Sequence, residues 1–122
     1  MSPKKQTTQH LKNAFFYSCC GLKEAYRSEV AFKQDICVCA ILFVLSLLLP
    51  VCLVLKIVMV MSLFFVLIAE LINTAIETII DRISLEIHPL SKKAKDIGSA
   101  LVFLSFIQVV FVFLASIIAI FI

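Results

Sequence analysis

Two acidic residues interrupt a stretch of sequence that is otherwise apolar enough to cross a membrane. Residues 57–80, IVMVMSLFFVLIAELINTAIETII, contain Glu70 and Glu77. A helix of about 20 apolar residues crosses the hydrocarbon core of a bilayer. An ionised carboxylate at that depth costs several kcal/mol, so it normally faces protein, water or a bound cation. We therefore expect this pair to mark a functional site.

Composition indicates a membrane protein built from helices. Of the 122 residues, 62% are hydrophobic and only 16% are charged, which is too apolar for a soluble domain of this length. Alternating segments of about ten residues, typical of a membrane β-barrel, do not recur in the sequence. We expect a single all-α integral membrane domain over residues 1–122, with transmembrane helices over 36–55, 57–80 and 97–122. Pro50 should end or bend the first of them.

The segment that precedes the first span has a different pattern. Over residues 7–33, aromatic and aliphatic side chains recur at helical spacing among lysines and an arginine. An aromatic-rich helix with a basic face is typical of an amphipathic helix that lies in the membrane interface. A soluble helix packed on a partner domain is the alternative interpretation.

Basic residues are distributed unequally among the segments outside the spans. Six Lys or Arg residues precede the first span and four lie between the second and third, whereas the first connection contains only Lys56. An excess of Lys and Arg marks cytoplasmic segments. The amino terminus and residues 81–96, a helix extension and loop, should therefore be cytoplasmic, with the carboxyl terminus on the outer side. The net charge of +3 needs no nucleic-acid partner to explain it.

A polar stripe continues from the second span into the cytoplasmic connection. Glu70, Asn73, Glu77 and Asp81 fall within about 80° of one another on a helix. If the span begins near residue 57, Glu70 lies in the cytoplasmic leaflet, Glu77 at the boundary and Asp81 in water. Carboxylates at turn spacing suit a hard cation such as Mg²⁺, which often binds one or two carboxylates together with substrate phosphates.

The same connection carries a cluster of positive charge that could meet phosphate. Lys92, Lys93 and Lys95 lie beside Asp96, a mixture that suits a nucleotide triphosphate and its metal ion. The lysines alone are most simply explained as charges that set the topology. A phosphate loop of the G-x-x-x-x-G-K-[ST] type is absent from the sequence, so a nucleotide must be held by another device.

Several motifs follow one another along the chain. They are Tyr17-Ser18-Cys-Cys-Gly21-Leu22, Ser28-Glu29-Val-Ala31-Phe32-Lys33-Gln34, Glu70-Leu-Ile-Asn73-Thr-Ala-Ile-Glu77-Thr-Ile-Ile-Asp81-Arg82, Glu86-Ile-His88-Pro-Leu-Ser91 and Ala94-Lys95-Asp96-Ile-Gly98-Ser99-Ala100. Together they closely resemble the prokaryotic diacylglycerol kinase family, and the resemblance covers nearly the whole chain.

This resemblance implies a homotrimeric enzyme of the bacterial inner membrane, with three spans and an amphipathic surface helix in each chain. Its expected reaction is transfer of the γ-phosphate of ATP to diacylglycerol, which gives phosphatidic acid. Undecaprenol kinase is the alternative within the same class of enzyme. A small proton-coupled exporter, which also uses an intramembrane Glu, is the alternative from another class.

The resemblance also implies roles for individual positions. Glu70 matches the general base, and Glu29 and Glu77 match carboxylates that bind Mg²⁺. The positions that match the nucleotide site are Tyr17, Glu29, Asn73, Glu77, Asp81, Glu86, His88, Lys95 and Asp96. Those that match the lipid site are Ala31, Phe32, Glu70 and Ser99.

Overall fold

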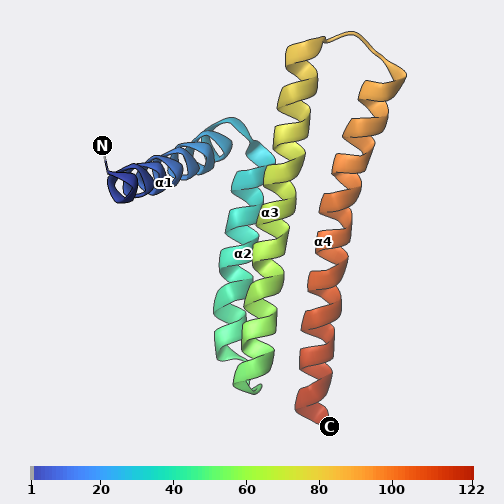
Figure 1. The fold of residues 1–122 in the computed structure, drawn as a ribbon. Helices are drawn as coiled ribbons and strands as arrows, with labels where there is room; N and C mark the ends of the chain where they lie inside the picture. The colour runs from blue at the N-terminus through green and yellow to red at the C-terminus, as the bar shows by residue number, and fades with distance from the viewer. Residues whose placement is uncertain (1) are drawn as a thin grey trace.

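The computed structural model describes residues 2–122, which form four α-helices. The helices are α1 (Pro3–Ser28), α2 (Val30–Leu48), α3 (Leu53–Ile83) and α4 (Pro89–Phe121). α2, α3 and α4 run alongside one another, and α1 projects to one side of them (Figure 1). The α3–α4 loop lies at one end of this bundle, and the α2–α3 turn and the carboxyl terminus lie at the other. The predicted all-α fold is confirmed.

Three of the helices, α2, α3 and α4, are long and apolar enough to cross a membrane. Many of their large apolar side chains point away from the bundle: Phe64, Phe103 and Phe111 are 61%, 66% and 72% exposed. Exposing apolar surface to water costs about 25 cal/mol per Å². That cost disappears in lipid, so the outward-facing side chains agree with a multi-pass membrane protein.

The boundary between α1 and α2 lies earlier than the sequence predicted. Helix α1 ends at Ser28, and Glu29 adopts an extended conformation with φ −112° and ψ 111°. The Glu29 backbone N–H still donates to the Ala25 carbonyl oxygen at 3.0 Å, so Glu29 caps α1. The next helix starts at once, at Val30 rather than at residue 36. It ends at Leu48 rather than at residue 55, just before Pro50, the residue expected to end or bend this helix.

Buried side chains at seven-residue spacing hold α2 against α3. On α2 these are Phe32, Cys39 and Ser46, and on α3 they include Met59 and Val66. A seven-residue repeat keeps one face against its neighbour when two helices cross at about 20°. The α2–α3 pair therefore has a fixed rotational register. This register determines which polar side chains of α2 face α3.

On another side, α3 packs against α4, where small and polar side chains allow close contact. The Gln108 amide Nε2 donates to the Ser62 carbonyl oxygen at 2.7 Å, a bond between helices within the apolar part of the bundle. Nearer the α3–α4 loop, Gly98 is buried against Asn73. A Cβ atom at Gly98 would overlap the Asn73 Oδ1 atom, so glycine permits this approach.

Hydrogen bonds within the chain close the turn at the opposite end of the bundle. The Lys56 ammonium donates to the Leu47 carbonyl oxygen at 2.9 Å. The end of a helix leaves its last carbonyl groups without helical partners, and Lys56 satisfies one of them. The Leu49 N–H donates to the Leu45 carbonyl oxygen at 3.0 Å, which ends α2 in the same way.

Candidate functional site

Helix α3 brings the predicted polar stripe to the end of the bundle that carries the α3–α4 loop. Glu70 is only 7% exposed, Asn73 and Glu77 are half-buried, and Asp81 is exposed. From Glu70 to Asp81 the helix rises about 16 Å. A single helix face thus leads from a buried carboxylate to a solvated one.

Carboxyl groups from three parts of the chain gather around Glu70. We call Glu29, Asp35, Glu70 and Glu77 the acidic cluster. The charges of Asp35, Glu77 and Glu29 all act on the Glu70 carboxyl group, and Asp35 comes within reach of a hydrogen bond to it. Asp35 comes from α2, Glu77 from α3, and Glu29 from the break between α1 and α2. The break lies at Glu29 rather than between residues 33 and 36, where the sequence predicted it, and this shifted break supplies one member of the cluster.

Sequence reasoning missed Asp35. The sequence does contain a signal for it. Asp35 is an acidic residue immediately before the predicted span 36–55, and on a helix it lies within a turn of Phe32 and Cys39. Both neighbours are buried against α3. A carboxylate on the buried face of a helix indicates a functional site in the same way as a carboxylate inside a span.

Asn73 connects the acidic cluster to α4. Its Nδ2 atom donates to the Glu77 Oε1 atom at 3.4 Å, which holds the Glu77 carboxylate on its side of α3. Its Oδ1 atom is buried without a hydrogen-bond partner and faces Gly98. The Asn73 side chain therefore lies between the Glu77 carboxylate and the backbone of α4 at Gly98.

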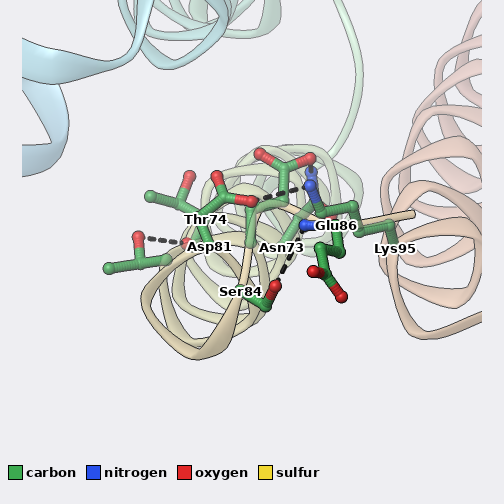
Figure 2. A network of polar contacts seen from close by, with 8 residues as sticks. Asn73, Thr74, Asp81, Ser84, Glu86 and Lys95 are labelled. Atoms are coloured by element: carbon green, nitrogen blue, oxygen red, sulfur yellow. Dashed lines mark hydrogen bonds and ion pairs between the residues drawn. The ribbon is translucent and has the colours of Figure 1, made fainter. Parts of the chain in front are cut away.

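A pocket of about 330 Å³ lies beyond the acidic cluster, at the α3–α4 loop. We call it the charged pocket. The Lys95 ammonium donates to the Asp81 Oδ1 atom at 2.8 Å across its base, and so joins α4 to α3 (Figure 2). This hydrogen bond raises the pKa of Lys95, which lies ahead of the apolar part of α4. The pocket is lined by Ile80, Asp81, Ser84, Leu85, Glu86, Ile87, His88, Ser91, Lys92, Lys95 and Asp96.

The loop side of the charged pocket is shaped by the start of α4. The His88 Nδ1 atom accepts a hydrogen bond from the Leu90 backbone N–H at 3.1 Å, so His88 caps the helix, and Pro89 follows at its first position. The Ser84 hydroxyl accepts a hydrogen bond from the Glu86 backbone N–H at 3.0 Å (Figure 2). These bonds place Glu86 and His88 at the pocket. In the sequence, each residue taken alone resembled an ordinary solvated loop residue.

Asp96 lines the same pocket and forms an ion pair with Lys92 at 2.7 Å, one helical turn back. The two side chains are 64% and 73% exposed. An exposed pair of this kind contributes at most about 1 kcal/mol. Both charges can therefore leave each other for a ligand at little cost.

The remaining predicted site residues lie away from the charged pocket. Tyr17 is 68% exposed on α1, where its ring meets the Phe16 ring edge-on at 5.9 Å between centroids. Phe32 is buried, while Ala31 and Ser99 are exposed on α2 and α4. The structure thus brings Asp81, Glu86, His88, Lys95 and Asp96 together in one pocket, and Glu29, Glu70 and Glu77 together in the acidic cluster.

The donor atoms of the acidic cluster fit a magnesium ion that arrives with phosphate. Within residues 2–122, no three His, Cys, Asp or Glu side chains converge in a ready-made metal cage. Mg²⁺ does not require one, because it is commonly held by one or two carboxylates, with phosphate and water completing its shell. Glu29 and Glu77 provide two such carboxylates, and the charge of each acts on Glu70.

Comparison with known proteins gives a consistent result over most of the chain. The family model described as prokaryotic diacylglycerol kinase matches residues 16–118. A diacylglycerol kinase of Pseudomonas aeruginosa is 41% identical over 106 residues, which cover 85% of this chain and 86% of the relative. Those of Haemophilus influenzae and Escherichia coli K12 are 41% and 37% identical, covering 79% and 77% of this chain and 81% and 77% of the relatives.

Proposed function

Because the chain belongs to the prokaryotic diacylglycerol kinase family and is a kinase, we propose that it transfers the γ-phosphate of ATP to diacylglycerol, forming phosphatidic acid. One observation carries this proposal beyond the family name. Helix α3 joins the buried Glu70 to Asp81 in the charged pocket along a single face. A kinase that acts on a lipid must bring a water-soluble nucleotide to an apolar alcohol, and a helix that links the two environments suits that task.

In this proposal, the charged pocket binds the nucleotide. Lys95 turns from Asp81 toward the phosphates, since a hydrogen bond from a charged donor contributes about 1.5–3 kcal/mol. Glu86, His88 and Asp96 line the rest of the pocket and contact the nucleotide there. Tyr17 and Asn73 approach it from α1 and α3.

Glu29 and Glu77 would hold the Mg²⁺ ion that accompanies ATP. When bound there, the ion neutralises charge on the phosphate oxygens during transfer. The Asn73 side chain keeps the Glu77 carboxylate oriented for this role. Glu29 contributes from the extended residue between α1 and α2, so the position of α1 bears on metal binding.

Glu70 acts as general base. The lipid hydroxyl oxygen forms a bond to the γ-phosphorus while the bond between that phosphorus and its bridging oxygen breaks, and ADP leaves with the electron pair. Glu70 accepts the hydroxyl proton, which needs a hydrogen-bond approach of about 2.6–3.2 Å. Its burial suits this role because water competes little for the carboxylate. Ala31, Phe32 and Ser99 line the path of the lipid.

The same physical arguments support a proposal for the oligomeric state of the protein and for its orientation in the membrane. We propose that three copies associate as a homotrimer, because packing polar stripes inward shields them from lipid. We also propose that the amino terminus and residues 81–96 lie on the cytoplasmic side of the inner membrane, where ATP is available, and the carboxyl terminus in the periplasm. The excess of Lys and Arg in the first two segments supports this orientation.

The test is a phosphate-transfer assay with purified protein in detergent micelles. With ATP, Mg²⁺ and short-chain diacylglycerol, radiolabel should pass from the γ-position of ATP to phosphatidic acid. Equal concentrations of undecaprenol in the same reaction should compete poorly. Preferential labelling of undecaprenol would make the chain an undecaprenol kinase. Proton movement driven by a hydrophobic cation, with no labelled lipid, would indicate the exporter.

A further inference from the structure

We infer that Asp35 is a positioning residue for Glu70, which it holds toward the lipid hydroxyl through a hydrogen bond between the two carboxyl groups. This inference rests on the proposed function, in which Glu70 is the base. It adds a residue from a second helix to the catalytic arrangement.

The first observation is an unpaired oxygen. Asp35 lies in the α2–α3 contact, and its Oδ2 atom is buried without a hydrogen-bond partner. A buried polar atom left unsatisfied costs about 1–3 kcal/mol, and more when it is charged. Such atoms are rare in folded proteins and call for an explanation. Packing alone offers none, because an apolar residue would fill the same place without that cost.

The second observation is what Asp35 faces. Glu70 is 7% exposed, and of its acidic neighbours only Asp35 is within reach of a hydrogen bond to its carboxyl group. A small adjustment of either side chain completes the bond and satisfies the buried Oδ2 atom. The other charged groups that act on Glu70 are Glu77 on α3 and Glu29 at the α1–α2 break, and both are assigned to the metal.

The third observation is that α2 cannot turn Asp35 away. Phe32 and Cys39 lie within about one turn on either side of it, and both are buried. The Cys39 thiol also lies 3.9 Å from the Leu63 carbonyl oxygen of α3 in the geometry of a weak hydrogen bond. These contacts fix the register of α2, so the Asp35 carboxyl group stays directed toward α3.

A hydrogen bond between two carboxyl groups needs one proton between them, because two adjacent carboxylates repel. In the proposed arrangement that proton lies between Asp35 and Glu70, at the Glu70 oxygen that faces Asp35. The other Glu70 oxygen remains free to accept the proton of the lipid hydroxyl. Asp35 takes no proton from the substrate, and therefore acts on the reaction only through the orientation of Glu70.

The test compares Asp35→Asn with Asp35→Leu in the full-length protein in micelles. Asparagine retains the size of the side chain and forms a hydrogen bond to Glu70 through its amide, so it should retain most of the wild-type kcat. Leucine fills the site but forms no such bond, and kcat should fall by about 100-fold, the scale of a misplaced catalytic group. The KM for ATP and that for diacylglycerol should stay near wild type in both variants.

Val109→Ala is the control for packing. It shortens a buried side chain of the apolar core, on α4 rather than on α2, without removing a carboxyl group. It should lower the thermal stability and leave kcat unchanged, which separates packing from positioning. If Asp35→Leu fails to fold, Asp35→Ala provides the same comparison without the added bulk.

Two results would overturn the inference. One is a wild-type kcat in Asp35→Leu or in the folded Asp35→Ala. The other is an Asp35→Asn variant as slow as Asp35→Leu, which would show that an ionisable group, rather than a hydrogen bond, is needed at Asp35. A wild-type protein that labels no diacylglycerol would instead contradict the proposed function, and it is measured before any variant.

Discussion

The two ends of the helical bundle use their polar groups in different ways. At the α2–α3 turn, the Lys56 ammonium is bonded to the Leu47 carbonyl oxygen and helps to close a helix end. In the half of the bundle nearer the α3–α4 loop, Asp35 Oδ2 and Asn73 Oδ1 are buried without partners. Polar atoms that complete a fold are satisfied within it. Those that serve a ligand or a reaction remain available, and the second end is therefore where the chemistry should occur.

The ion pairs at the α3–α4 end support the same contrast between the two ends of the bundle. Lys95 and Asp81 are about half exposed, and Lys92 and Asp96 are more so. Pairs of this kind contribute at most about 1 kcal/mol to stability. We propose that they hold charge in place for a substrate, because they add little to the stability of the fold. Four substitutions test this contrast between the ends, and they follow in order of expected effect.

Glu70→Gln should have the largest effect. Glutamine keeps the size of the side chain but cannot accept a proton, so kcat should fall by about 10²–10⁴-fold, the contribution of a general base. Steady-state kinetics with saturating ATP and diacylglycerol measures it, and circular dichroism checks that the helices are retained. An unchanged kcat in a folded variant would remove Glu70 from the mechanism.

Lys95→Met should weaken nucleotide binding. Loss of a charged hydrogen bond of about 1.5–3 kcal/mol raises the KM for ATP by roughly 10- to 100-fold. The matched control is Lys93→Met, which removes a nearby exposed lysine that does not line the charged pocket. Equal effects of the two substitutions would mean that general positive charge, rather than the position of Lys95, attracts the nucleotide.

Gly98→Ala should destabilise the protein at the α3–α4 contact. The added Cβ atom overlaps the Asn73 Oδ1 atom, and forcing extra volume into a packed site costs about 1–3 kcal/mol. Gly21→Ala is the control on α1, where an added Cβ atom meets nothing within 4 Å. That substitution should stabilise its helix by up to about 1 kcal/mol. Denaturation in mixed micelles compares the two, and a Gly98→Ala variant as stable as Gly21→Ala would contradict the close approach.

Lys56→Met should have the smallest effect and should act on stability alone. Removing one hydrogen bond to a helix end costs about 1 kcal/mol. Phosphate transfer should be unaffected, because the substitution lies at the end of the bundle away from the acidic cluster. A loss of kcat comparable to that of Lys95→Met would erase the distinction between the two ends.

Much of the architecture followed from the sequence because its causes are local. Hydrophobic length determines the spans, and Pro50 ends α2 where its ring predicts. The periodicity of Glu70, Asn73, Glu77 and Asp81 placed them on one helix face, and α3 carries all four. These properties depend on residues that are close together in the sequence, so the sequence alone is enough to predict them.

The position of the break between α1 and α2, at Glu29 rather than between residues 33 and 36, could not be predicted because it has no local cause. Neither glycine nor proline lies near it, and residues 7–33 continue the helical pattern through it. The chain breaks there because α1 leaves the direction of the bundle while α2 packs along α3 (Figure 1). That is a tertiary constraint, and it overrides helix propensity.

The site was predictable to the extent that its residues share α3. Asp35 was missed because its importance depends on the register of α2 against α3, a contact between residues far apart in sequence. The cap formed by His88 was missed for a different reason. It requires knowing that α4 begins at Pro89, well before the predicted span 97–122.

The central claim is that the acidic cluster and the charged pocket serve one reaction at one end of the bundle. The most direct measurement replaces Mg²⁺ with paramagnetic Mn²⁺ in the presence of ATP, with ¹³C-labelled carboxyl groups and solid-state NMR in bilayers. Strong broadening of the Glu29, Glu70 and Glu77 carboxyl signals is expected, while labelled Lys56 at the opposite end stays sharp. Sharp Glu70 and Glu77 signals with saturating Mn²⁺ and ATP would contradict this claim.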